Sequence, residues 1–347
     1  MIGQPRIGTK SLATLCRRMA MSLSAGVDIR SVWLREAGAA RGVGRSRLAN
    51  INDGVQRGES VSDSLQQTGK YFPELFRELV KVGEESGHLP EVFDRLAEHY
   101  EHQVRLRRAL VGALAWPFLE LLLALFVVGI LIYVMGAIPQ LAQAKVDMLG
   151  FGLTGTGGLL TYLGFLGFVG VGLFLLYRAT VRGVLWVAPI QRLLMWVPQL
   201  GKALETFAMA RLAWAMHVTL NSGMDLRKAL KLSLRNTHNV RYTQHIDHVL
   251  SAVRSGREVH EALAETRSFP VHFVEAVQVG EESGQLVETM ANLARQYQDE
   301  ARTAMNILSV LFGVAVMALI AALIIFLIFR IFMNAYLGPI NDAMNMR

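Results

Sequence analysis

Two adjacent glutamates occur twice in this chain within the same hexapeptide, Val-Gly-Glu-Glu-Ser-Gly: first as Glu84 and Glu85, then 197 positions later as Glu281 and Glu282. The hexapeptide glycines are Gly83, Gly87, Gly280 and Gly284. Paired carboxylates can act as general acid and base, or ligate a metal ion, when their oxygens converge. Neighbouring residues on a helix point about 100° apart, so adjacent side chains converge only where the helix breaks. The favoured interpretation of the hexapeptide is therefore a packing motif with a polar network. A surface that contacts a partner is the alternative, and metal or acid–base chemistry is disfavoured.

The hexapeptides belong to a longer repeat. Residues 12–106 align with residues 209–303 at an offset of 197. Between Val55 and Leu65 the offset is 198, so the second copy gains one residue before this segment and loses one after it. Insertions of this kind are tolerated in loops. The chain therefore contains a duplicated domain of about 100 residues.

Each copy is expected to form six helices. Apolar residues recur at intervals of three and four, as in Leu12, Leu15, Met19 and Leu23, and no run of alternating residues indicates a strand. The second copy should repeat the six-helix bundle of the first. In the first copy the helices are expected near residues 8–25, 28–38, 43–57, 60–68, 73–86 and 88–108.

The expected helix ends carry residue types that cap helices. Glycine can adopt the left-handed conformation that ends a helix, aspartate accepts hydrogen bonds at a helix start, and proline suits a first helical turn. Gly83 and Gly280, in the fifth helix of each copy, have no side chain, so another segment can approach closely there. The C-capping glycines are Gly26, Gly223, Gly87 and Gly284, the N-capping aspartates are Asp28 and Asp225, and the prolines are Pro73 and Pro270.

Three stretches are long and apolar enough to cross a membrane. The chain is 52% hydrophobic with a mean hydropathy of +0.33, which is too apolar for a soluble protein of 347 residues. Because about 20 apolar helical residues span a bilayer, we place transmembrane helices at residues 109–136, 158–177 and 307–333. The sequence thus predicts an all-α membrane protein with two homologous cytoplasmic six-helix bundle domains plus three transmembrane helices.

One charged residue lies inside the first predicted span. Glu120 is about one turn inside the membrane, where its carboxylate either stays near the cytoplasmic face or pairs with a polar group of another helix or subunit. Gly164, Gly167 and Gly170 form a small-residue stripe in the second span, which would allow close helix approach.

Basic residues predict the orientation of the chain. The net charge is +7 and the pI is about 9.7, and the excess of Lys and Arg lies in residues 1–108 and 178–304. No cleavable signal peptide is recognisable at the N-terminus. By the positive-inside rule, repeat 1 (1–108) and the segment with the linker and repeat 2 (178–304) are cytoplasmic, whereas the short loop (137–157) and the tail (334–347) are external. This distribution explains the basic pI without nucleic acid, so we expect a lipid bilayer and no nucleic acid among the partners.

Enzymatic patterns are missing from the sequence. No phosphate-binding G-x-x-x-x-G-K-[ST] loop occurs, and a membrane aspartic peptidase would need a second intramembrane carboxylate. The histidine pairs His99/His102 and His245/His248 have metal-binding spacing but no repeated counterparts, so exposed helix faces explain them better. Cys16 is the sole cysteine and is expected to pack in the core. We therefore expect no catalytic, cofactor-binding or metal-binding residues.

The repeated motifs resemble those of the type II secretion system F family. They are "LSAGVDI" and "LNSGMDL", the two Phe-Pro and Val-Gly-Glu-Glu-Ser-Gly segments, "LAWPFLEL" with Pro117 near the first span, and "WVPQLGKA" before the second copy. In that family a helical domain with such a motif occurs twice, each copy is followed by a transmembrane segment, and one further span lies between them. Glu120 departs from the apolar residue expected at its position.

The resemblance implies a function. Family members are inner-membrane platform proteins of type II secretion and type IV pilus machines, so we expect a non-enzymatic, homo-oligomeric platform in the bacterial inner membrane. It would couple a cytoplasmic secretion ATPase to the assembly of pilin-like subunits, together with other inner-membrane assembly proteins. The alternative is a small-solute membrane transporter, which usually requires polar residues or broken helices at mid-membrane.

Overall fold

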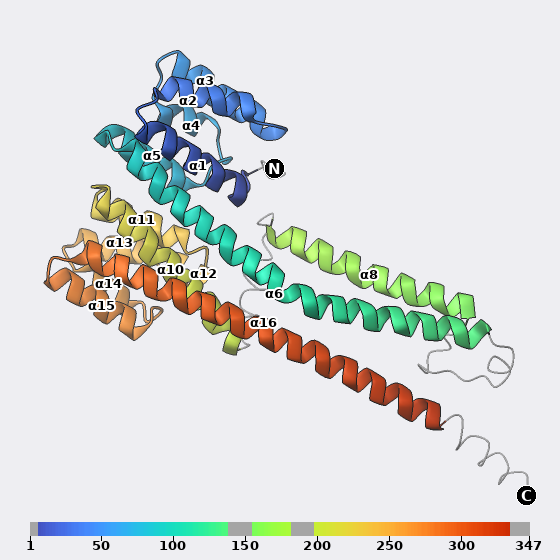
Figure 1. The fold of residues 1–347 in the computed structure, drawn as a ribbon. Helices are drawn as coiled ribbons and strands as arrows, with labels where there is room; N and C mark the ends of the chain where they lie inside the picture. Colours follow the sequence, from blue (N-terminus) through green and yellow to red (C-terminus); the bar gives the residue numbers. More distant parts are fainter. Residues whose placement is uncertain (1–5, 138–154, 182–197, 334–347) are drawn as a thin grey trace, which may run out of the picture. The chain divides into compact units, whose positions relative to one another are not determined.

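The structure, a computed structural model, describes residues 6–137, 155–181 and 198–333, and every regular element in these residues is a helix (Figure 1). The prediction of an all-α fold is confirmed. The predicted external loop, the linker before the second copy and the C-terminal tail lie largely or wholly outside the described residues, so their sidedness stays a prediction.

The first copy forms the expected helices. The five complete helices of its bundle begin and end within two residues of the predicted bounds. They are α1 (Thr9–Ser24), α2 (Ile29–Ala39), α3 (Val43–Gln56), α4 (Val61–Gln67) and α5 (Glu74–Ser86), and α6 (Leu89–Ala137) follows.

The second copy repeats this order with one change. Its helices are α10 (Pro198–Asn221), α11 (Leu226–Asn236), α12 (Val240–Thr243), α13 (Ile246–Arg254), α14 (Val259–Glu265), α15 (Val271–Glu282) and α16 (Leu286–Phe332). The continuous α3 of the first copy corresponds to two helices here, α12 and α13. The offset changes from 197 to 198 within this segment. The inserted residue therefore falls inside a helix of the first copy, and the second copy accommodates it by opening a turn.

Local capping follows the sequence prediction. The Asp28 carboxylate accepts hydrogen bonds from the backbone N–H groups of Arg30 (3.0 Å) and Ser31 (3.4 Å) at the start of α2. Asp225 does the same at the start of α11. Gly26 and Gly223, which precede these caps, have φ of 78° and 80°, a conformation that strains residues with a Cβ atom. The equivalent turns of the two copies are thus built by the same residue types.

The two copies form one compact unit. This unit comprises Met1–Ala109 and Leu193–Met305, and one hydrophobic cluster runs through the described part of both copies. Ion pairs join α11 to α5, with Lys228 Nζ 2.8 Å from Glu78 Oε2 and Arg235 2.7 Å from Glu74 Oε1. The largest fully buried side chains include Trp33, Phe72, Phe76, Phe93, Tyr242, Phe273 and Tyr297. Burying aromatic side chains contributes strongly to stability because each removes a large apolar area from water.

The last helix of each copy runs on into apolar sequence. A helix was expected to end near residue 108, but α6 runs on to Ala137 and is 49 residues long in total, and α16 is 47 residues long. At 1.5 Å per residue, α6 is about 74 Å long. The change from charged to apolar residues after Arg108 alters what surrounds the helix and leaves its backbone hydrogen bonds intact. Bundle and predicted span are therefore parts of one helix.

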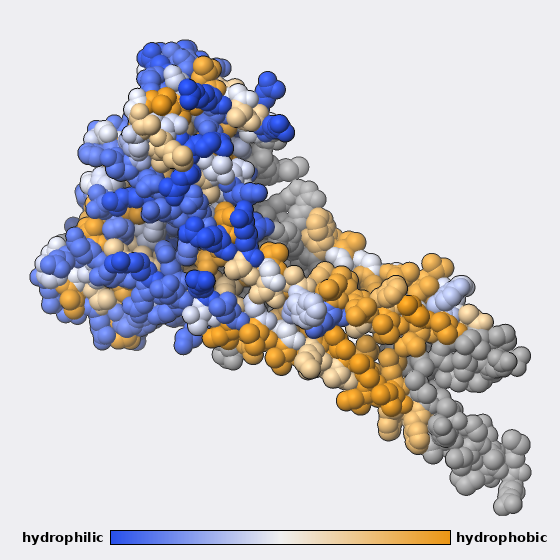
Figure 2. Space-filling model, in the orientation of Figure 1, coloured by the Kyte–Doolittle hydropathy of each residue, from blue (hydrophilic) through white to orange (hydrophobic). Residues whose placement is uncertain are grey.

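A second compact unit contains the apolar segments. It comprises Leu110–Arg192 and Asn306–Arg347, and its described part holds the apolar ends of α6 and α16 together with α8 (Gly155–Val181). Three helices of the described chain are long and apolar enough to cross a membrane. Figure 2 shows hydrophobic residues gathered over these segments and hydrophilic residues over the bundles. Such exposed apolar surface is typical of residues that contact lipid.

Candidate functional site

The two Val-Gly-Glu-Glu-Ser-Gly segments each end a helix. In the first copy α5 ends at Ser86, and Gly87 follows with φ of 76°; in the second, α15 ends at Glu282, and Gly284 has φ of 68°. Both glycines thus adopt the left-handed conformation expected at a helix C-terminus. The next helix begins two residues after this glycine in each copy, so the hexapeptide forms the last turn of helix five and the start of the connection to helix six.

The first glutamate of each segment caps another helix. Glu84 accepts hydrogen bonds from the backbone N–H groups of Val61 (2.6 Å) and Ser62 (2.8 Å), the first two residues of α4. These N–H groups have no partner within their own helix. A carboxylate there satisfies both donors and interacts favourably with the positive end of the helix dipole. Glu84 thus stabilises the start of a helix 23 residues earlier in the chain.

The second copy has the same arrangement at the equivalent residues. Glu281 accepts hydrogen bonds from the backbone N–H groups of Val259 (2.7 Å) and His260 (2.8 Å) at the start of α14. The His260 ring adds a third contact, since its Nδ1 lies 2.9 Å from Glu281 Oε2. Recurrence of the contact in both copies indicates that it is a constant feature of this bundle.

The second glutamate of each segment points elsewhere. The side chain of Glu85 is 63% exposed and lies 3.8 Å from Lys81 one turn earlier. Glu282 is also exposed, and it accepts a hydrogen bond from Gln278 (2.7 Å). The first carboxylate of each pair therefore lies at the start of another helix, and the second lies at the surface. Neither pair has the convergent oxygens that acid–base catalysis requires.

The glycine before each pair permits close packing of helices five and six. A Cβ atom at Gly83 would lie 2.8 Å from Val92 Cγ2, and one at Gly280 would lie 2.7 Å from Thr289 Oγ1. Val92 and Thr289 are equivalent positions of the two copies. Non-bonded carbon atoms pack at about 3.5–4.0 Å, so a methyl group at either glycine would force a shift. The glycines thus set the distance between two helices in each copy.

One group of side chains in the second copy has potential metal ligands. Glu258, His260 and Glu281 each have one candidate ligand atom within 4.8 Å of the others. Ser60 and Ser62 hold the corresponding positions of the first two in the first copy, and the Ser60 hydroxyl caps α4 there by accepting from Asp63 N–H (3.0 Å). The mixed histidine and carboxylate donors would suit Zn²⁺. Because Glu281 already accepts hydrogen bonds through both oxygens, capping accounts for its position without an ion.

The histidine pairs have separate roles. The exposed position expected for His99 is wrong, because its ring is buried and stacks on Trp214 of the second copy, with ring centroids 3.4 Å apart. Burial lowers the pKa of His99 to about 3, so its ring stays neutral. His245 lies 3.0 Å from the Ser268 hydroxyl, whereas His248 lies 3.3 Å from Glu265. Within the described residues, neither pair belongs to a group of three metal-ligating side chains.

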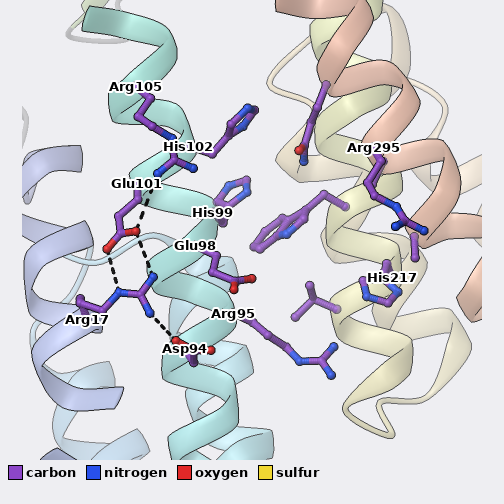
Figure 3. Close-up of a pocket in the computed structure, with 15 residues that line it drawn as sticks. Arg17, Asp94, Arg95, Glu98, His99, Glu101, His102, Arg105, His217 and Arg295 are labelled. Carbon is purple, nitrogen blue, oxygen red and sulfur yellow. Dashed lines mark hydrogen bonds and ion pairs between the residues drawn. The ribbon is translucent and has the colours of Figure 1, made fainter. Parts of the chain in front are cut away.

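A polar cavity lies between the two copies, and the sequence analysis missed it. It has a volume of about 880 Å³ and is bordered by α1, α6, α10 and α16 (Figure 3). Arg17 forms hydrogen bonds to both oxygens of Glu101 (2.8 and 3.0 Å) and pairs with Asp94. The Arg17 guanidinium holds the pKa of the Glu101 carboxyl below its usual range. Charged residues spaced three and four apart on α6 could have signalled this face, but its partner surface comes from residues more than 100 positions away.

Glu120 lies on α6 in the second unit. Its side chain is half-buried, and within the described residues it makes no hydrogen bond or ion pair. Pro117, one turn earlier, lies inside the helix, and a Cβ atom at Gly313 of α16 would lie 3.4 Å from its ring. The structure thus brings α6 and α16 close together next to Glu120, while a partner for its carboxylate stays a prediction.

Comparison with known proteins gives the family. The profile of the family described as "Type II secretion system (T2SS), protein F" matches residues 15–137 and again residues 215–333. Together these two matches cover more than half of the chain, and each runs from a helical bundle into the apolar end of its last helix. The chain belongs to the type II secretion system protein F family. The two matches also confirm the internal repeat.

Relatives within the F family come from two kinds of machine. Type II secretion system protein F of Vibrio cholerae is 27% identical over 349 residues, covering 98% of this chain and 84% of that protein. Type IV pilus assembly protein PilC of Pseudomonas aeruginosa is 27% identical, covering 92% and 87%, and PilC of Thermus thermophilus is 27% identical, covering 84% and 74%. Together with the three apolar helices, these likenesses identify an inner-membrane protein with a role in secretion or pilus assembly.

Proposed function

We propose that the protein is a non-enzymatic platform of a type II secretion or type IV pilus machine, which couples a cytoplasmic ATPase to the assembly of pilin-like subunits. The observation that carries the proposal is the doubled family match on two helical bundles, each continuous with an apolar segment. Packed helical bundles suit this task because they move as rigid bodies. The diverging glutamates support a structural role for the motif and offer no catalytic centre.

Of the motif's glutamates, the exposed second ones are those accessible to a partner. Glu84 and Glu281 are engaged in capping, whereas Glu85 and Glu282 project into solvent. We therefore assign the contact with the ATPase, or with another assembly protein, to the surface around Glu85 and Glu282. Charges on the rim of an interface mainly affect association rates and their salt dependence.

Binding and hydrolysis by the purified full-length chain test the proposal. We expect the chain to bind its cognate ATPase and to hydrolyse no ATP by itself. The variant Glu85→Arg/Glu282→Arg should bind the ATPase more weakly at low salt while staying folded, with a thermal midpoint within a few degrees of the wild type. Hydrolysis that persists after removal of contaminating ATPases would contradict a non-enzymatic platform. Unchanged binding by a folded charge-reversal variant would exclude these turns as the contact surface.

The orientation is proposed with both bundles in the cytoplasm and the C-terminus outside. Labelling of single cysteines tests it. Because Cys16 is the sole cysteine and Ala213 takes its place in the second copy, Cys16→Ala should give a folded cysteine-free background. In intact spheroplasts, a membrane-impermeant maleimide should label Asn345→Cys in the tail and leave Ser255→Cys in the second bundle unlabelled until the membrane is permeabilised. The reverse labelling pattern would overturn the orientation.

A further inference from the structure

A small basic pocket lies where the first bundle gives way to the apolar part of α6. It has a volume of about 310 Å³, which is at the lower end of the range of small-ligand pockets, about 300–1,000 Å³. Residues of α1 and of the end of the charged part of α6 line it, with Ala13 and Val104 as apolar contributions. The charged residues in its lining are Lys10, Arg17, Arg18, Arg105, Arg108 and Glu101.

The cations differ in how far they are neutralised. Arg17 forms hydrogen bonds to Glu101, and Arg18 forms two hydrogen bonds of 2.6 Å to the buried Glu36. Arg105 lies 3.9 Å from the same Glu101, and its side chain is 64% exposed. Within the described residues, no ion pair involves Lys10 or Arg108. An anion in the pocket would therefore meet at least two cationic groups whose charge no carboxylate offsets.

The second copy shows that the bundle does not require these charges. At the offset of 197, the positions of Lys10, Arg17, Arg18 and Arg108 hold Phe207, Trp214, Ala215 and Met305. The helices that carry them, α10 and α16, are formed just as well. Arg105 keeps a basic counterpart, Arg302, but the other four cations have none. The cluster of cations is thus a property of the first copy, and a need other than folding explains it better.

The position along α6 indicates the ligand. Arg108 directly precedes the uncharged run that begins at Ala109, so in a membrane its guanidinium lies at the depth of lipid headgroups. Arginine and lysine bind phosphate groups well, and arginine can do so through two parallel hydrogen bonds. We propose that this pocket binds the phosphate headgroup of an anionic phospholipid, held chiefly by Lys10, Arg105 and Arg108.

Lipid titration of the full-length chain tests the proposal. The protein in a non-ionic detergent is titrated with dioctanoyl phosphatidylglycerol, and bound lipid is counted by native mass spectrometry. Each cation that contacts the phosphate should tighten lipid binding about fivefold. We therefore expect Lys10→Gln/Arg108→Gln to raise the Kd about 30-fold, which corresponds to about 2 kcal/mol. Dioctanoyl phosphatidylcholine should bind the wild type much more weakly than phosphatidylglycerol does.

A matched variant distinguishes binding in the pocket from general attraction of the lipid by basic residues near the membrane. Arg107 neighbours Arg108 at nearly the same membrane depth but does not line the pocket, and Arg45 is exposed elsewhere in the same bundle. Arg45→Gln/Arg107→Gln removes as much charge and should leave the Kd within about threefold of wild type, a change of less than about 0.7 kcal/mol. Equal losses in both double variants would overturn the pocket, as would unchanged binding in Lys10→Gln/Arg108→Gln.

Two further arms complete the test. Inorganic phosphate, added alone, should not displace the lipid at equal concentration; if it does, the pocket binds free phosphate and the lipid assignment is wrong. Thermal midpoints of both double variants are compared with wild type to verify folding. Should Lys10→Gln/Arg108→Gln fail to fold, the single variant Lys10→Gln, at an exposed position, carries the same prediction with about a fivefold rise in Kd, or about 1 kcal/mol.

Discussion

Replacing the first glutamate of the hexapeptide should destabilise the bundle far more than replacing the second. Glu84→Gln keeps the shape of the side chain but retains one acceptor oxygen for two backbone donors, Val61 N–H and Ser62 N–H. One hydrogen bond to a charged group is lost, which contributes about 1.5–3 kcal/mol, and the new amide turns a donor toward a donor. Since Glu84 is half-buried, we expect a loss of about 2 kcal/mol in the free energy of unfolding.

Glu85→Gln is the matched control for this prediction. Glu85 is exposed, and its contact with Lys81 at 3.8 Å is an ion pair between residues one helical turn apart, a type that contributes about 0.3–0.5 kcal/mol. For a domain of 150–250 residues, each kcal/mol shifts the thermal midpoint by about 2–4 °C. Glu84→Gln should therefore lower the midpoint by about 4–8 °C, and Glu85→Gln by no more than about 2 °C.

Two measurements test the difference. Thermal unfolding of the full-length chain in detergent can be followed by tryptophan fluorescence, to which Trp33, fully buried in the first copy, contributes together with four other tryptophans. Hydrogen exchange should also accelerate at the amides of Val61 and Ser62 in Glu84→Gln and stay unchanged in Glu85→Gln. If both variants show the same midpoint and the same exchange at these amides, the cross-helix cap does not stabilise the bundle. Glu281→Gln and Glu282→Gln repeat the comparison in the second copy.

Two other predictions follow from packing and from burial. Gly83→Ala should cost about 1–3 kcal/mol because its Cβ would clash with Val92 Cγ2 at 2.8 Å; adding Val92→Ala should then raise the thermal midpoint of Gly83→Ala, and a further fall would refute the clash. The pKa of buried His99 is about 3, below its ordinary value of 6.5, so the unfolded chain binds the proton first and stability is lost as pH falls below about 6.5. His99→Gln, which carries the residue found at the equivalent position in the second copy, should reduce the pH dependence of unfolding by up to about 1.4 kcal/mol per pH unit between pH 6 and 4. Chemical denaturation across this range checks it, and equal slopes in the two proteins would contradict a buried neutral ring.

Local features of the fold were predictable because short stretches of sequence determine them. Asp28 and Asp225 cap their helices through backbone groups two and three residues away, and Gly26 and Gly223 take the left-handed conformation within the preceding turn. The repeat strengthened each prediction, since every local signal occurred twice. Apolar length alone identified the three candidate spans.

Features that depend on distant residues were not predictable in the same way. Nothing near Glu84 in the sequence indicates that it caps α4, because the capped residues are more than 20 positions away. The cavity between the copies and the stacking of His99 on Trp214 require the docked arrangement of both repeats. The turn between α12 and α13 depends on how the second copy accommodates its inserted residue. The continuity of α6 past residue 108 depends on a helix that persists while its surroundings change from charged to apolar.

The cap provided by Glu84 has a consequence for the order of folding. With seven residues, α4 is far shorter than the about 12–15 residues that an isolated helix needs in water. Part of its N-terminal capping comes from a side chain that the ribosome adds 23 residues later. During synthesis α4 should therefore remain largely unformed until α5 has emerged and docked. Helices four and five of each repeat would then fold together in one cooperative step. Folding of each bundle during synthesis would therefore wait until its hexapeptide has emerged.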